Sequence, residues 1–270
     1  MAPVTRSDLL SALAELGVRQ GDTLCVHTSM SRIGRVMGGA QTVIAALIEA
    51  TGPQGTLMMP AYTRDCAHPN EWQYPPAPPE WIARADETPA FDPRLTPSVN
   101  CGAVAELFRT WPGAIRSRHP ISSVAALGPL AERLTHGVPL DNRFGPASPY
   151  GRLYDIGGKV LMLGAPYETM SLLHLTEYLL AGGRLGQYGK PVVKTARTES
   201  GWVEFNDVLL PHAWAEACVG NMVSMGHARV GFLGQGRLLC VEARTAVDYA
   251  MQWRRAHEPK EEEQPFFVMT

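Results

Sequence analysis

A chain of 270 residues is long enough to bury a full hydrophobic core in one large domain or two small ones. Hydrophobic residues make up 45% of the sequence and charged residues 19%, as in an ordinary folded soluble protein. The formal net charge of -2 gives no indication of a nucleic-acid partner. No apolar run reaches the roughly 18 residues of a membrane helix, and the N-terminus lacks a signal-peptide core, so we expect a cytoplasmic protein that does not engage a membrane.

The cysteines are odd in number and lie far apart in the sequence. They are Cys25, Cys66, Cys101, Cys218 and Cys240. No CxxC or Cys/His spacing of a metal site is present. We therefore expect reduced thiols, several of them buried as small hydrophobic side chains, and no metal cofactor.

The N-terminal part of the chain alternates helical and strand-like patterns. Leucines at helical spacing predict a helix over residues 5–17, and a second amphipathic pattern predicts one over residues 41–51. Short apolar runs predict buried strands at residues 23–27 and 56–60. A polar, glycine-containing loop at residues 28–39 connects the first strand to the second helix.

Residues 64–99 interrupt this alternation. Eight prolines fall in the stretch, so it cannot form one regular element. Trp72 and Trp81 argue against simple disorder, because disordered segments are poor in aromatic residues. We predict an ordered excursion on the surface that contributes to substrate binding.

The C-terminal part of the chain returns to regular structure. Helical patterns predict helices at residues 101–110, 129–134, 170–180, 211–225 and 245–256. Apolar runs predict strands at residues 159–163, 192–195, 201–205 and 238–242. The charged tail from residue 258 is expected to be loosely held. Because continuous apolar strands alternate with helices, we predict an α/β fold with a sheet covered on both faces.

One segment, SLLHLTE at residues 171–177, carries a possible catalytic set at the start of a predicted helix. His174 and Glu177 are three residues apart and share a helix face, so the carboxylate can orient the imidazole and stabilise its protonated form. Ser171 lies on the same side and can donate a hydrogen bond to a carbonyl oxygen. Acyl transfer from a thioester to an amine needs such a base and such a donor. The spacing HxxE by itself is also common in helices without a catalytic role.

Two further segments have the composition of phosphate-binding loops. The first, HTSMSRIG at residues 27–34, offers hydroxyls, backbone N–H groups and the charge of Arg32. The second, RSRHPISS at residues 116–123, offers two arginines, a histidine and three serines. The alternatives are an ordinary strand-to-helix connection for the first and a basic surface turn for the second.

In combination and in this order, these segments resemble the aminoglycoside 3-N-acetyltransferases, the antibiotic N-acetyltransferase family. The resemblance covers residues 6–256 and includes VHTSMSRIG, GPQGTLMMPAYT, RSRHPISSVAALGPLA, GGKVLMLGAP and SLLHLTE. It implies a three-layer α/β/α fold with a mixed central sheet, in one domain spanning residues 1–270. It also implies acetyl-CoA as the donor and the 3-amino group of a 2-deoxystreptamine aminoglycoside as the acceptor, a reaction that gives antibiotic resistance. This family is distinct from the GNAT acetyltransferases.

The resemblance also assigns roles to residues. His174 becomes the general base with Glu177 beside it, and Ser171 stands where the family pattern often has threonine. The residues implied on the coenzyme side are Thr28, Ser29, Ser31, Arg32, Ile33, Gly34, Arg116, His119 and Ser122. An aminoglycoside is a polycation, so its site should be acidic. The candidates for substrate binding are Tyr62, Asp65, Glu71, Glu204 and Asp207.

Other functions remain open at the level of the sequence. The fold and the donor could serve the acetylation of another small amine metabolite, because a fold does not fix its substrate. A non-catalytic coenzyme-binding protein would be expected to have lost the His174–Glu177 pair, which is intact. A hydrolase would need a nucleophile elbow, and no GxSxG motif is present. Association into a homodimer is also left open.

Overall fold

The computed structural model describes residues 2–72, 75–181, 190–210 and 213–257. The tail from residue 258, and residues 211 and 212 at the start of one predicted helix, lie outside the described residues. Within the described chain, no helix is long and apolar enough to cross a bilayer. All five cysteines are free thiols, and four of them are buried.

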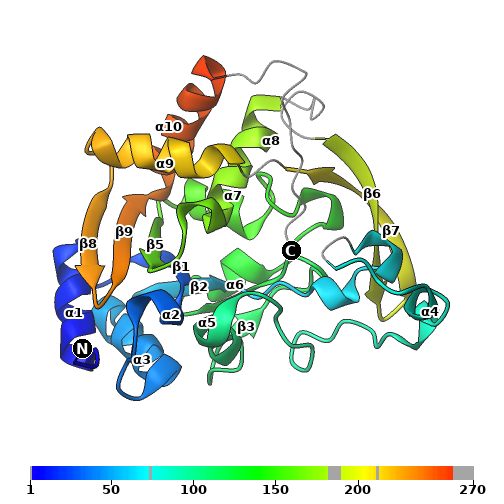
Figure 1. The fold of residues 1–270 in the computed structure, drawn as a ribbon, viewed down its shortest axis with the longest axis horizontal. Helices are drawn as coiled ribbons and strands as arrows, with labels where there is room; N and C mark the ends of the chain where they lie inside the picture. Colours follow the sequence, from blue (N-terminus) through cyan, green and yellow to red (C-terminus); the bar gives the residue numbers. More distant parts are fainter. Residues whose placement is uncertain (1, 73–74, 182–189, 211–212, 258–270) are drawn as a thin grey trace.

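A seven-stranded sheet forms the centre of the molecule, with the strand order β3-β4-β2-β1-β5-β9-β8 (Figure 1). The strands are β1 Thr23–Thr28, β2 Thr56–Pro60, β3 Ile115–Arg116, β4 Val124–Leu127, β5 Lys159–Leu163, β8 Arg229–Leu233 and β9 Gly236–Glu242. Strand β1 is parallel to β2 and β5, whereas every other pairing in this sheet is antiparallel. The predicted α/β fold with a mixed central sheet is therefore confirmed.

Helices cover both faces of the sheet. One layer contains α1 Arg6–Glu15, α3 Gly39–Thr51 and α5 Gly102–Arg109. The other contains α6 Ala131–Thr135, α7 Pro149–Asp155, α8 Leu175–Ala181, α9 Ala213–Ser224 and α10 Ala243–Ala256. Strand side chains alternate between the two faces, so in β5 Val160 packs in one core cluster and Leu161 in the other. Both clusters exclude water, which explains why the strands read as continuous apolar runs.

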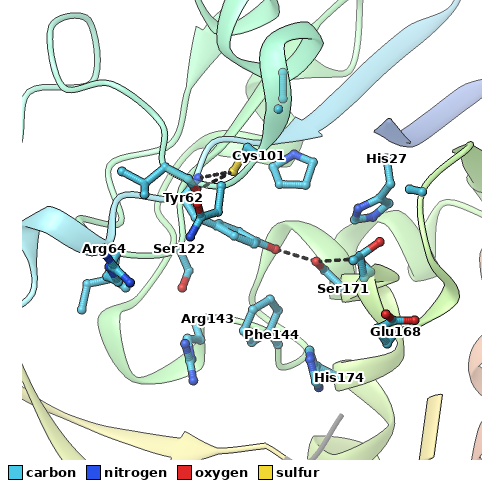
Figure 2. A pocket seen from close by; sticks show the side chains of 18 of the residues that line it. His27, Tyr62, Arg64, Cys101, Ser122, Arg143, Phe144, Glu168, Ser171 and His174 are labelled. Carbon is cyan, nitrogen blue, oxygen red and sulfur yellow. Dashed lines mark hydrogen bonds between the residues drawn. The ribbon is translucent and has the colours of Figure 1, made fainter. Parts of the chain in front are cut away.

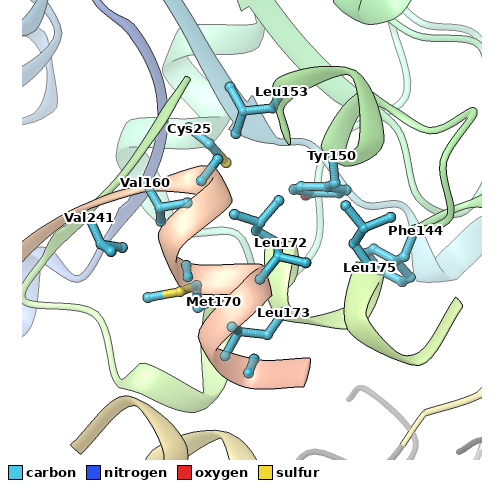
Figure 3. Close-up of a cluster of buried hydrophobic side chains, with 14 of the residues drawn as sticks. Cys25, Phe144, Tyr150, Leu153, Val160, Met170, Leu172, Leu173, Leu175 and Val241 are labelled. Atoms are coloured by element: carbon cyan, nitrogen blue, oxygen red, sulfur yellow. The ribbon is translucent and has the colours of Figure 1, made fainter. Parts of the chain in front are cut away.

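Short helical turns occupy the connections. They are α2 Met30–Ile33, α4 Pro79–Ile82, η1 Arg64–Cys66, η2 Pro69–Glu71, η3 Ala85–Glu87, η4 Leu140–Asn142, η5 Tyr167–Thr169 and η6 Ser171–His174. The turn η6 corrects the single helix predicted over residues 170–180, because the chain first makes a 3₁₀ turn and becomes α-helical only at Leu175. Figure 3 shows Leu172 and Leu173 of this turn within the buried cluster, beside Tyr150 and Leu175.

A separate two-stranded ribbon is made by β6 Lys190–Thr198 and β7 Gly201–Leu209, both longer than predicted. The described residues of the proline-rich excursion pack against this ribbon. An isolated bridge joins Ala67 to Ala196, and the rings of His68 and Trp202 meet at 4.7 Å. Helix α7 and strands β3, β4 and β8 were not predicted. Strand β8 is exposed along most of its length and so lacks an apolar run, and α7 spans only seven residues.

Candidate active site

A cavity of about 910 Å³ lies at the carboxyl ends of the three parallel strands β2, β1 and β5. Its walls also come from the start of α5, the excursion, the segment of η5 and η6, and the ribbon. Ligands of open α/β sheets bind at this edge, where connections leave in different directions and create a crevice. The cavity is therefore the candidate active site.

The structure brings nine of the predicted site residues to this cavity. They are Thr28, Ser29, Ser31, Tyr62, Glu71, Ser122, Ser171, His174 and Asp207. Arg32 lines a neighbouring cavity of about 570 Å³, and the two cavities share Ser31, Ala165, Pro166 and Glu168. The hydroxyl-rich loop after β1 thus faces both cavities.

Two residues of that loop have a structural position instead. Ile33 ends α2, is fully buried and belongs to the apolar core cluster that packs under α1 and α3. Gly34 caps the same turn with φ 98°, a conformation that favours glycine. Neither residue lines the cavity, so they shape the loop from within.

Arg116 does not line the cavity, contrary to its predicted place on the coenzyme side. Its guanidinium donates hydrogen bonds to the carbonyls of Ala61 and Thr96 and to Oγ of Ser123. It also lies over the ring of Phe91 at 5.2 Å. Burial lowers the pKa of Arg116 to about 10. These contacts tie the end of the excursion to the sheet, and the guanidinium is engaged by carbonyls of its own chain.

His119 is likewise buried and does not line the cavity. Its Nδ1 accepts hydrogen bonds from the backbone N–H groups of Ile121 and Ser122, and its Nε2 donates to the carbonyl of Leu140 at 3.1 Å. Burial lowers the pKa of His119 to about 4, so the ring is neutral at neutral pH. It holds the turn that presents Ser122 to the cavity.

Of the four predicted acidic residues, Asp65 and Glu204 do not line the cavity and are exposed. Side chains of the ribbon alternate between its two faces, so Glu204 points away from the face of Phe205 and Asp207. Asp207 is buried and forms an ion pair with Arg143, with Nε and Oδ1 2.9 Å apart. Glu71 pairs with Lys194, with Nζ and Oε2 3.2 Å apart.

Ser171 and His174 face the cavity together because η6 is a 3₁₀ turn, in which residues i and i+3 lie above one another (Figure 2). The intervening leucines enter the core and fix the turn. Nδ1 of His174 lies 3.6 Å from Oε2 of Glu177, which is fully buried behind it in the first turn of α8. The ring of Phe144 packs on the imidazole at 5.0 Å.

The electrostatics of this pair follow from burial. Burial, assisted by Arg143 and Arg254, lowers the pKa of His174 to about 3. Burial raises the pKa of Glu177 to about 8, although Arg254 and a hydrogen bond of 3.0 Å from the Trp214 indole oppose the shift. The imidazole is therefore neutral at neutral pH, and the pair as a unit gains or loses one proton close to pH 8.

The comparisons with known proteins agree with this geometry. Residues 25–255 match the family model described as Aminoglycoside 3-N-acetyltransferase. The curated Aminoglycoside N(3)-acetyltransferase IX of Micromonospora chalcea is 38% identical over 94% of both chains. A solved structure of AAC-IIIb in a binary complex with CoASH superposes with a TM-score of 0.80 at 31% identity, covering 97% of this chain and 100% of the other. A structure of AAC-VIa bound to sisomicin gives a TM-score of 0.81 at 30% identity, with coverage of 96% and 100%.

The chain belongs to the aminoglycoside 3-N-acetyltransferase family.

For an aminoglycoside 3-N-acetyltransferase, the site holds several residues that the sequence patterns did not single out. His27, Arg143, Phe144 and Lys194 all line the cavity, and Tyr150 and Trp214 support it from behind. Side chains of a strand alternate between its two faces, and Val192 lies opposite Asp207 in the ribbon. Lys194, two residues after Val192, therefore shares the face of Asp207, which could be inferred only once the pairing of the two strands was known. Arg143 and Phe144 lie in an irregular connection, where no periodic signal exists.

The charge of the lining differs from the acidic site expected for this family's substrates. Among the described lining residues, three acidic side chains stand against three basic ones: Glu71, Glu168 and Asp207 against Arg64, Arg143 and Lys194. Two of the three carboxylates are already paired with basic side chains of the chain itself. The cavity of this aminoglycoside 3-N-acetyltransferase is therefore close to neutral in formal charge.

Proposed function

We propose that this protein transfers the acetyl group of acetyl-CoA to the 3-amino group of a 2-deoxystreptamine aminoglycoside and so gives antibiotic resistance. The observation that carries the proposal is the joint presentation of Ser171 and His174 by η6 in the cavity, in a chain of this family. The relatives named for this activity, and neighbouring structures that hold CoASH or sisomicin, support it. Because acetyl-CoA is a cytoplasmic metabolite, the proposed activity places the protein in the cytoplasm.

His174 is the proposed general base. A neutral imidazole is the form that can accept a proton, and burial keeps it in that form. Once the ring is protonated, Glu177 at 3.6 Å, ionised above about pH 8, stabilises the imidazolium, as the acid of a catalytic triad does. The indole N–H of Trp214 holds the other oxygen of Glu177, which fixes the carboxylate plane.

Ser171 is the proposed donor to the acyl oxygen. Its Oγ accepts a hydrogen bond from the hydroxyl of Tyr62, so the proton of Ser171 remains for another acceptor. Oγ can also donate to the carbonyl of Thr169, but that contact is long at 3.5 Å. A donor held in this way lowers the barrier by stabilising negative charge that develops on an acyl oxygen.

The coenzyme would lie along the loop after β1. Acetyl-CoA supplies an activated acetyl group as a thioester. Thr28, Ser29 and Ser31 place hydroxyls along the cavity wall near Ser171, and Arg32 in the adjoining cavity provides a cation for a phosphate. Ser122 completes the opposite wall, while Ile33, Gly34, Arg116 and His119 would act by holding these segments in place.

The acceptor would lie on the side of the excursion and the ribbon. Tyr62, Glu71 and Asp207 line this side. The near-neutral lining also fits a smaller amine, so acetylation of another small amine metabolite is the second candidate.

A thiol-release assay with acetyl-CoA tests the proposal. We would offer gentamicin, tobramycin, kanamycin and apramycin, together with small diamines, and locate the acetyl group in any product by NMR. Thiol release with acetylation at N3 is the expected result. Turnover with small amines and with none of the four drugs would establish the second candidate and overturn the first.

A further inference from the structure

The ion pair between Glu71 and Lys194 bridges two elements across the acceptor side of the cavity. Glu71 belongs to η2 in the excursion, and Lys194 belongs to β6 of the ribbon. Both side chains line the cavity and are mostly covered, with exposed fractions of 15% and 14%. The pair is therefore partly shielded from the solvent that weakens surface ion pairs.

The carboxylate of Glu71 is held at both oxygens. Its Oε1 accepts a hydrogen bond from the backbone N–H of Thr195, and its Oε2 lies 3.2 Å from Nζ of Lys194. A cationic group that approached Glu71 from the cavity would meet a carboxylate already neutralised by a tethered ammonium. The tether gives Lys194 a high effective concentration at this position, which a free ligand must overcome.

The second acidic residue of the same side is less accessible than Glu71. The side chain of Asp207 is 1% exposed, and Arg143 covers it with Nε 2.9 Å from Oδ1. Arg143 also donates to the carbonyl of Val208 and lies over the ring of Phe144, so the arginine is fixed. Of the two ion pairs, only the one between Glu71 and Lys194 joins two side chains that are both partly exposed.

We propose that Lys194 is a specificity-determining residue that occupies, as an internal counter-cation, the position at Glu71 which an ammonium group of a highly charged acceptor would take. The proposal rests on the proposed function. It assigns the acceptor class. An amine that places a hydroxyl group, or no group, next to Glu71 binds without displacing Lys194. An aminoglycoside that places an ammonium group next to Glu71 must displace Lys194.

The test is equilibrium binding by titration calorimetry, which needs no turnover. The polyamine tobramycin and the diamine 2-deoxystreptamine are the probes, and wild type, Lys194→Met and Lys194→Gln are compared at low salt. We expect both variants to bind tobramycin about tenfold more tightly, a difference of about 1.4 kcal/mol, with a much smaller change for 2-deoxystreptamine. The gain should shrink as salt is raised.

Two control variants make the result specific. Lys190→Met removes an exposed lysine from the same strand, outside the cavity lining, and should leave tobramycin affinity unchanged. In the Glu71→Gln background, Lys194→Met should lose most of its gain, because no carboxylate is then unmasked. Thermal unfolding of each variant checks that it is folded.

Unchanged tobramycin affinity in both Lys194 variants would overturn the proposal, and so would an equal gain in the Glu71→Gln background. Failure of the proposed function appears separately, as an absence of thiol release by the wild-type protein with every aminoglycoside. A protein that binds tobramycin more tightly after Lys194→Met yet acetylates no aminoglycoside would retain this inference and lose the proposed function.

Discussion

The hydroxyl of Tyr62 donates a hydrogen bond of 2.8 Å to Oγ of Ser171, which joins the chain just after β2 to the turn that carries His174. The Tyr62 hydroxyl also contacts the hydroxyl of the fully buried Tyr150. Since Tyr62 donates its own proton to Ser171, Tyr150 must donate to Tyr62. A chain of three hydroxyls thus runs from the core to the cavity and sets the direction of the Ser171 proton; Figure 2 shows its last link, from Tyr62 to Ser171.

Tyr62→Phe removes the donor to Ser171 while keeping the ring that packs edge-on against Phe144 at 6.1 Å. We expect kcat to fall about tenfold, because Ser171 is no longer held as a donor. Ser171→Ala should cost as much or more, and the double variant should be no worse than Ser171→Ala, since both act on one interaction. Steady-state kinetics measure this. Tyr154→Phe, which removes a hydroxyl bonded to Asp248 elsewhere, is the matched control; if Tyr62→Phe behaves like that control, the hydroxyl chain has no role in turnover.

His174→Ala should lower kcat by at least about 100-fold, the usual contribution of a general base. Binding of coenzyme A and aminoglycoside, measured by calorimetry, should be largely kept, because the side chain does not carry a charge at neutral pH. His136→Ala, on the exposed end of α6, controls for the loss of an imidazole. Near-normal turnover of His174→Ala would remove this residue from the mechanism.

The pH dependence of turnover should reflect the His174–Glu177 pair. Below about pH 8 the carboxyl group of Glu177 already holds a proton. Above that pH Glu177 is ionised and His174 is neutral, so the pair can accept a proton from the amine. The ratio of wild-type kcat/KM to that of Glu177→Gln should therefore rise as pH increases through about 8. The acceptor amine titrates equally in both reactions, so it cancels from the ratio. A flat ratio between pH 6.5 and 9 would show that the two residues do not titrate as a unit.

Variants of Arg116 and Arg32 should distinguish an arginine that stabilises the fold from an arginine that binds the coenzyme. Arg116→Ala removes the hydrogen bonds from the guanidinium to the carbonyls of Ala61 and Thr96 and to Oγ of Ser123, so we expect a loss of about 2–4 kcal/mol in unfolding free energy. Affinity for coenzyme A should change little in folded protein. Arg32→Ala should do the reverse, with coenzyme affinity lowered about fivefold and stability kept. Chemical denaturation and calorimetry measure both quantities, and weaker coenzyme binding by a fully stable Arg116→Ala would return that residue to the coenzyme side.

Stability should fall as pH is lowered from about 6.5 toward 5. Burial lowers the pKa values of His27 and His119 to about 4 and that of His174 to about 3, below the ordinary 6.5. The unfolded chain then takes up protons that the native state does not, and one such shift is worth roughly 3 kcal/mol when complete. Glu177 opposes this, because its raised pKa lets the native state hold a proton that the unfolded chain releases. The Tm should therefore fall over this range, and more steeply in Glu177→Gln. A constant Tm in calorimetric scans would contradict the buried neutral histidines.

Much of the sheet was predictable, because burial on both faces leaves a mark in the sequence. Strands β2 and β5 begin and end at the residues predicted for them. The two-stranded ribbon was underestimated, since its exposed, polar outer face dilutes the apolar signal. Helix α7 was missed although Ser148 caps it and Pro149 suits its first position, because the helix spans only seven residues and includes Gly151, which weakens a helical pattern.

The family and the mixed α/β fold could be inferred from short-range patterns and from the order of the motifs along the chain, and so could the proposal that Ser171, His174 and Glu177 act together. The chain had to fold before it was visible that His174 ends a 3₁₀ turn and that Arg116 faces backbone carbonyls. The fold also shows that each cavity acid of the ribbon side meets a basic partner, as Glu71 meets Lys194. Glu71 and Lys194 are more than a hundred positions apart in the chain, and Arg143 and Asp207 more than sixty. The charge that a ligand meets depends on these neighbours in space, which spacing along the chain does not encode.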